Sequence, residues 1–160
     1  MDRIEQWAML ASALGCGLAA GVFFAFSAFV MPALDRLPAA QSIAAMQSIN
    51  KVAVTPAFMI ALFGTALACV GLGIWAVLAL DQRPAEWVLA GAALYLLGTI
   101  AVTIAANVPL NDALAAVNAH GGDAATRWSS YLTDWTLWNH VRAVAALGAS
   151  GLLAVALHVS

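Results

Sequence analysis

Charged residues are scarce in this 160-residue chain. They make up 9% of it and hydrophobic residues 64%, where soluble domains carry about 25% and about 45–50%. The formal net charge is −2, so no basic surface is available for phosphates and a nucleic-acid partner is excluded. Because about 30% of the surface of a folded chain of this size stays exposed, so much apolar surface needs a cover other than water. A soluble enzyme and a disordered tail are therefore excluded as well.

Cysteine and histidine are also rare, and their positions form no recognisable metal or redox motif. Cys16 and Cys69 both lie within long apolar runs, where thiols behave as small hydrophobes rather than as a disulfide framework. The three histidines lack the spacing of metal ligands. The sequence therefore predicts no cofactor, and a copper or iron centre built from histidine and methionine side chains is the weaker alternative.

Four long apolar runs predict membrane-spanning helices over about residues 7–31, 56–80, 87–108 and 135–159. A hydrocarbon layer about 30 Å thick needs about 20 helical residues to cross it, and strands of this length would leave backbone groups unpaired in lipid. The sequence thus predicts a single all-α domain over residues 1–160, an integral-membrane four-helix bundle. The first run is too long for the apolar part of a signal peptide, so we expect it to be retained.

The connectors between these runs are unequal in length. The second, residues 81–86, can only join antiparallel neighbours. The first is expected to break at Met31–Pro32 and again at Leu37–Pro38, and it then carries apolar residues at helical spacing up to Thr55. The third, residues 107–134, behaves similarly. Both broad connectors are therefore predicted to contain short amphipathic helices at the membrane interface.

Polar side chains near the membrane gather at one end of the predicted bundle, where the broad connectors lie. Arg142 is the sharpest signal, because a charge near the centre of a membrane helix costs at least ~2.5 kcal/mol. It shares a helical face with Trp135, and we expect it to face Asn107 and Asn111 across a lined hollow. The alternatives are a structural arginine paired with a carboxylate or a lipid phosphate, and asparagines that only bond neighbouring helices.

Four stretches of the chain carry a resemblance to a known family. They are Val30-Met31-Pro32-Ala33-Leu34, Met46-Gln47-Ser48-Ile49-Asn50, Asn107-Val108-Pro109-Leu110-Asn111-Asp112 and Trp135-Thr136-Leu137-Trp138-Asn139-His140-Val141-Arg142. In these stretches the chain resembles the anthrone oxygenase-like family of small four-span membrane proteins, most of them bacterial. The resemblance implies a multi-pass protein of a bacterial inner membrane. Fungal members that share the pattern oxidise anthrones to anthraquinones without a known cofactor.

The resemblance further implies a membrane oxidoreductase that uses O₂ on a hydrophobic, enolisable substrate of the aromatic-polyketide kind. Such a reaction needs a flat apolar slot, a cation for the developing oxyanion and a proton acceptor. Arg142, with Asn139 or Asn107, is expected to stabilise the oxyanion, and Asp112 or Asp134 is expected to take the proton. The slot and the remaining substrate contacts are expected from Phe26, Phe29, Trp135, Trp138, Asn50 and Asn111.

Other functions stay open on the sequence alone. The same hollow would suit a non-catalytic protein that binds a lipid, a quinone or another hydrophobe, and it would also suit a subunit of a membrane complex. The partners expected in every case are the lipid bilayer and a hydrophobic small molecule. Nothing in the sequence decides between a monomer and a homo-oligomer.

Overall fold

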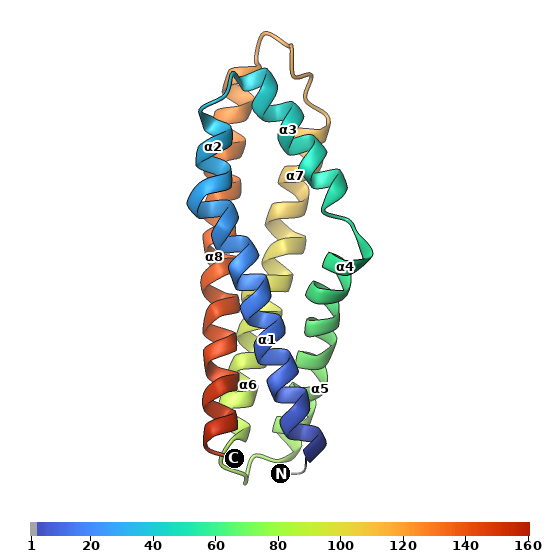
Figure 1. The fold of residues 1–160 in the computed structure, drawn as a ribbon, viewed down its shortest axis with the longest axis vertical. Coiled ribbons are helices and arrows are strands. Elements are labelled where there is room, and N and C mark those ends of the chain that lie inside the picture. Colours follow the sequence, from blue (N-terminus) through green and yellow to red (C-terminus); the bar gives the residue numbers. More distant parts are fainter. Residues whose placement is uncertain (1–2) are drawn as a thin grey trace.

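The computed structural model describes residues 3–160, which fold into helices with no strand among them. Four antiparallel spans are each long and apolar enough to cross a membrane (Figure 1). The predicted all-α four-helix membrane bundle is therefore confirmed. The first two spans and their connector comprise α1 (Arg3–Ala25), the π-helical segment η1 (Phe26–Val30), α2 (Met31–Asp35), α3 (Ala39–Val52), α4 (Pro56–Met59), η2 (Ile60–Gly64) and α5 (Thr65–Leu78). The last two comprise α6 (Ala85–Ala93), η3 (Leu94–Ala101), η4 (Thr103–Asn107), α7 (Val108–Ala115) and α8 (Ala124–His158).

The helices extend further at the loop end than the apolar runs alone indicate. We call loop end the end of the bundle that carries residues 36–38 and 116–123. The first span runs to Asp35, the third to Ala115, and α8 already begins at Ala124. Thirty-five residues make α8 about 52 Å long, well beyond a hydrocarbon layer of about 30 Å. The helical part of the third connector therefore continues the third and fourth spans, whereas α3 is a separate helix.

The chain does not break at Met31–Pro32, as the sequence led us to expect, but passes through it in helical conformation. Pro32 lies in the first turn of α2, directly after η1. A proline inside a helix removes one hydrogen bond and clashes with the carbonyl four residues earlier, and the wider turn of a π-helical segment relieves that crowding. The expected break at Leu37–Pro38 is present, since α2 ends at Asp35 and Pro38 precedes α3.

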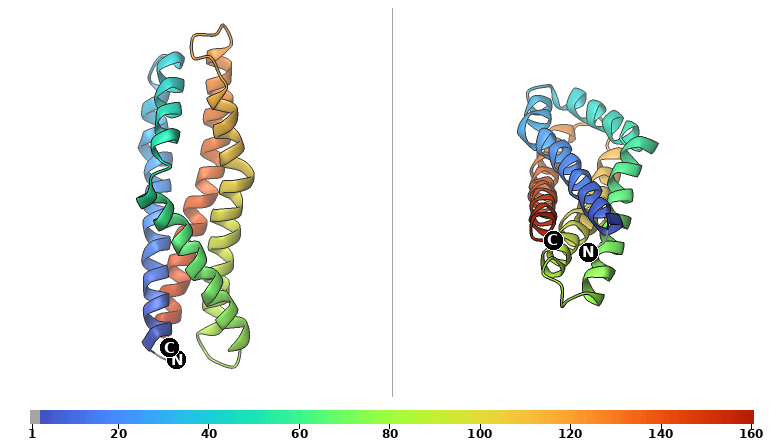
Figure 2. Two further views of the ribbon diagram at one scale, coloured as in Figure 1. Left: turned by 90° about the vertical axis from the view of Figure 1, so that its right-hand side faces the viewer. Right: turned by 60° about the horizontal axis from the view of Figure 1, so that its bottom comes forward.

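Two separate apolar clusters hold the bundle together. The lower core joins α1, α5, α6 and α8 toward the chain termini, and the upper core joins α2, α3, α7 and α8 at the loop end (Figure 2). Buried residues of the lower core include Met9, Cys16, Phe23, Leu62, Cys69, Tyr95 and Leu153. Those of the upper core are Met31, Leu34, Ile43, Met46, Leu114, Ala124, Trp128, Tyr131 and Trp135.

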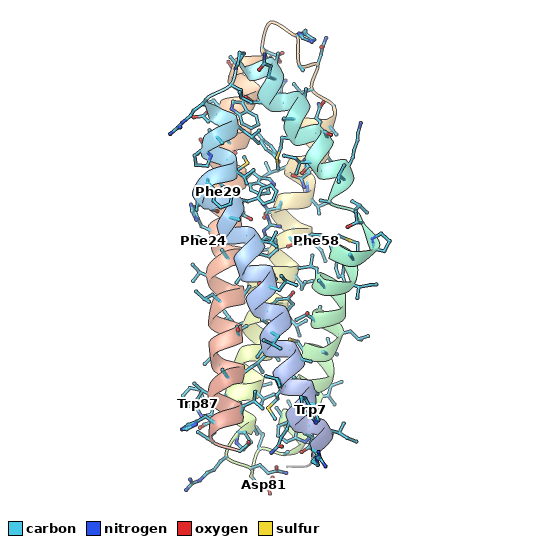
Figure 3. All side chains as sticks on the ribbon, viewed as in Figure 1. Trp7, Phe24, Phe29, Phe58, Asp81 and Trp87 are labelled. Atoms are coloured by element: carbon cyan, nitrogen blue, oxygen red, sulfur yellow. The ribbon has the colours of Figure 1, made fainter. Side chains whose placement is uncertain are left out.

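Exposed aromatic side chains mark two levels on the outside of the bundle. Trp7 and Trp87 lie near the end with the chain termini, and Phe29 lies on the outer side of the first span toward the loop end (Figure 3). Trp138, on α8, is also exposed. Twenty helical residues from Trp138 to His158, at the far end of α8, rise about 30 Å, close to the thickness of a hydrocarbon layer. Tryptophan and tyrosine collect at both of its interfaces, so Trp138 marks the interface on the loop side. The loop end, with α3, therefore extends beyond the apolar layer.

Close contact between α8 and the third span depends on the absence of a side chain at Gly98. A Cβ added there would overlap the Cβ of Ala145, which is buried. We expect Gly98→Ala to push the two helices apart and to lower the free energy of unfolding by about 1–3 kcal/mol. Unfolding in mixed detergent measures this loss. The control is Gly71→Ala, whose added methyl group meets nothing within 4 Å, and equal stability of the two variants would contradict this packing.

Candidate functional site

A cavity of about 220 Å³ lies between the lower and the upper core. Its walls come from the first span, α3, the second span, the third span and α8. They are mainly aromatic and aliphatic, with a few polar groups, as in most small-molecule sites. The lining residues are Val22, Phe23, Phe26, Met46, Ile49, Asn50, Ala53, Val54, Phe58, Met59, Leu62, Phe63, Thr103, Val108, Asn111, Trp135 and Arg142.

Arg142 brings the only charge among these lining residues, and it is buried with 5% of its surface exposed. One terminal nitrogen, Nη2, donates to Oδ1 of Asn139 at 2.7 Å, and Nη1 donates to Oγ1 of Thr103 at 3.3 Å. The guanidinium carbon lies 4.3 Å from the centre of the Phe23 ring and 5.3 Å from that of Trp135. Aromatic faces attract cations, by about 2 kcal/mol or more where water is excluded.

The guanidinium of Arg142 lacks a negative partner in the described part of the chain. The one ion pair found between residues 3 and 160 joins Arg127 to Asp123, both of them exposed, in the loop-end region. The buried Nε of Arg142 donates to no acceptor. Buried charges in proteins are normally paired, and so this cavity offers an anion a site with hydrogen-bond donors already in place.

Asn139 holds the guanidinium from behind and is itself held by the first span. Its side-chain nitrogen donates to the backbone oxygen of Phe23 and to Oγ of Ser27, both at 2.7 Å. With the bond from Arg142 to Oδ1, each end of this buried amide is used. The arrangement fixes which way the amide faces, and therefore where the guanidinium lies.

Asn111 organises the aromatic wall at the loop end of the cavity. Its Oδ1 accepts from Nε1 of Trp135 at 2.8 Å and from the hydroxyl of Tyr131 at 2.9 Å. Trp135 stacks on Tyr131 with ring centres 6.2 Å apart, and its ring centre lies 5.7 Å from that of Phe26. The indole that faces the cavity is thus held on both sides, which makes a rigid flat wall.

Two further asparagines leave a buried polar atom without a partner. Asn50, at the end of α3, lines the cavity, and its Nδ2 makes no hydrogen bond. Asn107 lies behind the cavity wall, where Nδ2 donates to the backbone oxygen of Trp135 at 3.2 Å while Oδ1 is unpaired. Unpaired buried amides are costly, so each of these two atoms marks a place where a hydrogen-bond partner is missing.

The structure brings together only part of the set of residues predicted from the sequence. Phe26, Asn50, Asn111, Trp135 and Arg142 line the cavity. Asn107 and Asn139 lie directly behind it through the contacts just given. The others stand outside: Phe29 is 61% and Trp138 41% exposed, and Asp112 and Asp134 are exposed and do not border the cavity.

Several contributors to the site were not singled out in the sequence. Phe23 supplies a ring and a carbonyl, Ser27 an acceptor for Asn139, and Thr103 an acceptor for Arg142. Thr103 lies four residues before Asn107 in the third span, a spacing that places both on one side of the helix, and this spacing was the available signal. For Phe23 and Ser27 no signal in the sequence separated them from neighbouring apolar and small residues.

Comparison with known proteins identifies a family. A family model described as anthrone oxygenase matches residues 57–152, more than half of the chain. The matched segment includes the second and third spans and most of α8, with Arg142, Asn139 and Asn111, but neither α1 nor α3. No curated protein and no solved structure matches the chain.

Proposed function

This chain belongs to the anthrone oxygenase family, and from that premise we propose that it is a membrane-embedded oxidoreductase. It uses O₂ to oxidise a hydrophobic, enolisable substrate of the aromatic-polyketide kind in the cavity at Arg142. The observation that supports this most is the buried guanidinium without a carboxylate, set among aromatic side chains. A substrate that becomes an anion there meets a preorganised counter-charge in a site of low dielectric, where such stabilisation is largest.

For an anthrone, the overall change is anthrone plus O₂ to anthraquinone plus water. The ring methylene first loses a proton and becomes an aromatic enolate. The enolate gives one electron to O₂, and the carbon radical and superoxide then combine to form a C–O bond. The peroxide takes up a proton. The carbon then loses its remaining hydrogen as a proton, the O–O bond breaks and a new carbonyl group forms. The departing hydroxide combines with a proton to give water.

We assign the anion-stabilising task in this sequence to Arg142, and the flat slot to Phe23, Phe26 and Trp135. Arg142 places its guanidinium beside the enolate oxygen, and Asn50, which also lines the cavity, brings a second donor that has no partner. None of the lining side chains is a carboxylate, a histidine or another base, so the proposal leaves the proton to a water molecule inside the cavity. The exposed carboxylates of the loop end have no part in it.

The proposal includes no resident cofactor, because an enolate that is aromatic reduces O₂ without one. Within residues 3–160, no three histidine, cysteine or acidic side chains gather as a metal-binding group. Elemental analysis of the purified protein tests this part, since a stoichiometric amount of copper or iron would require a different mechanism.

The proposed activity is tested by adding anthrone to the protein in lipid nanodiscs and following O₂ uptake and product absorbance together. We expect one O₂ consumed for each anthraquinone formed, at a rate proportional to protein and above that of empty nanodiscs. Saturable binding of anthrone without O₂ uptake would instead favour the non-catalytic alternative, a carrier or sensor of hydrophobes that uses the same cavity.

A further inference from the structure

The cavity at Arg142 reaches the surface of the bundle where its lining residues are most exposed. Its other lining residues are buried or half-buried, but three apolar residues are both lining and substantially exposed: Val54 (69%), Phe63 (44%) and Val108 (42%). Val54 and Phe63 belong to the second-span side and Val108 to the third-span side. The opening that these three residues border, called the seam below, therefore lies between the second and third spans.

The packing of the two spans explains why a seam exists at this level. In the upper part of the second span, η2 packs against α1, while η4 and α7 of the third span pack against α8, and α7 also packs against α3. Nearer the chain termini, α5 and α6 pack directly against each other. The second span thus diverges from the third toward the loop end, as Figures 1 and 2 show.

The loop end of the cavity is closed by the upper core. Met31, Ile43 and Met46 are fully buried there. Gln47 fastens α3 over α7, because its Nε2 donates to the backbone oxygens of Leu114 at 2.9 Å and Val117 at 3.1 Å. The lower core closes the opposite side. The three lining residues that are exposed all lie at the seam.

The depth of the seam places it against lipid. Arg142 lies 16 residues before His158 at the far end of α8, which is about 24 Å along the helix axis. Trp138, at the interface level, is one turn closer to the loop end. The cavity is therefore inside the apolar layer of about 30 Å, near its loop-side boundary, and the residues that border the seam are all hydrocarbon.

We propose that the substrate is a molecule dissolved in the bilayer and that it passes between the cavity and the membrane through the seam, with its acidic end toward Arg142. This proposal rests on the proposed function, which supplies the chemistry of the acidic end of the substrate. It adds the class of substrate, a hydrophobe concentrated in lipid rather than a water-borne metabolite. Passage along the membrane also lets an apolar product leave without crossing the upper core.

The experiment narrows the seam and measures how fast a stable ligand arrives. The probe is 1-hydroxyanthraquinone, which does not undergo the oxidation and reports binding by its own fluorescence. It is delivered by mixing probe-loaded vesicles with protein in vesicles of the same lipid. The seam variants are Val108→Trp and Phe63→Trp. The matched controls, Ile104→Trp and Ile60→Trp, lie on the same two helical segments or directly beside them, are 58% and 70% exposed, and do not border the cavity.

We expect the probe to associate about tenfold more slowly with the seam variants, which is within the usual range for changes in association rate. The control variants should have association rates close to that of the unaltered protein. The rate should follow the amount of probe per lipid rather than per volume of water. Thermal unfolding confirms that each variant is folded, and Phe63→Trp, the smaller change in volume, serves if Val108→Trp does not fold.

The outcomes separate this proposal from the proposed function. If folded seam variants bind the probe at an unchanged rate, the proposed passage through the seam is wrong, whatever the O₂ uptake of the protein. If association is slowed but the unaltered protein consumes no O₂ with anthrone, the passage through the seam is supported and the proposed oxygenase activity is wrong. Association that depends on the aqueous concentration of the probe overturns the membrane route.

Discussion

Arg142→Met is expected to lower kcat for anthrone oxidation by about 10²–10³-fold, the loss usually caused by removing one donor to a developing oxyanion. Methionine fills a similar volume and keeps the contacts with the Phe23 and Trp135 rings. It removes the one charge among the lining residues of the cavity. The enolate would then form without a counter-charge in an apolar site, where an unpaired anion is very costly. O₂ uptake in nanodiscs measures the loss.

The fold should tolerate this change, because replacing a buried charge by a hydrophobe is often neutral or stabilising. The one partner left unpaired is Oδ1 of Asn139, and an unsatisfied acceptor costs about 1–3 kcal/mol. The control is Arg142→Lys, which keeps the charge but not the planar set of donors, and we expect it to fall between the other two proteins. Full turnover by a folded Arg142→Met protein would remove the anion-stabilising role from this residue.

The binding spectrum of a hydroxyanthraquinone checks the same role without catalysis. A phenolate absorbs at longer wavelength than the phenol, and the protein with Arg142 should bind the phenolate at pH values where free probe is still a phenol. In Arg142→Met the bound probe should keep the phenol spectrum over that range. A phenolate spectrum in both proteins would indicate that the cavity does not select an anion.

The fold followed from the sequence because its signal is simple. A run of about 20 apolar residues has one stable structure in a bilayer, and four such runs in one chain must cross it in alternating directions, which leaves little choice of topology. Antiparallel order then brings residues of α3, the third span and α8 to one end, which is why Asn50, Asn111, Trp135 and Arg142 meet. That part of the site depends on topology alone.

The exact lining of the cavity could not be obtained in this way. Periodicity assigns a face about a third of a turn wide, so it groups Trp135 with Trp138, although the first is 5% and the second 41% exposed. The same width admits Asp134, one residue from a cavity wall yet exposed. The π-helical segments also shift the face of a helix beyond each of them, and periodic patterns do not reveal where they occur.

The second large effect is expected from Asn139→Leu, which acts through the position of Arg142. Leucine has nearly the same volume, but it removes the bond to Nη2 of Arg142 and the bonds to Phe23 and Ser27. The guanidinium would then retain only the longer bond to Thr103 at 3.3 Å. Misplacing a catalytic group by about 1 Å can cost about 10²-fold in rate, and we expect a loss of about 10–10²-fold in kcat.

The matched control is Ser27→Ala, which deletes one acceptor of Asn139 and leaves its bonds to Arg142 and Phe23 in place. We expect turnover within about threefold of the unaltered protein, since the free energy of a single neutral hydrogen bond is only about 1 kcal/mol and the guanidinium is not released. If Asn139 only stabilised the fold, Asn139→Leu and Ser27→Ala would both act by lowering the amount of folded protein. A positioning role instead predicts that folded Asn139→Leu protein still binds the hydroxyanthraquinone but shows the phenol spectrum, as Arg142→Met does. If Asn139→Leu is folded, binds the phenolate and turns over at full rate, the guanidinium is held by the aromatic rings and not by the amide.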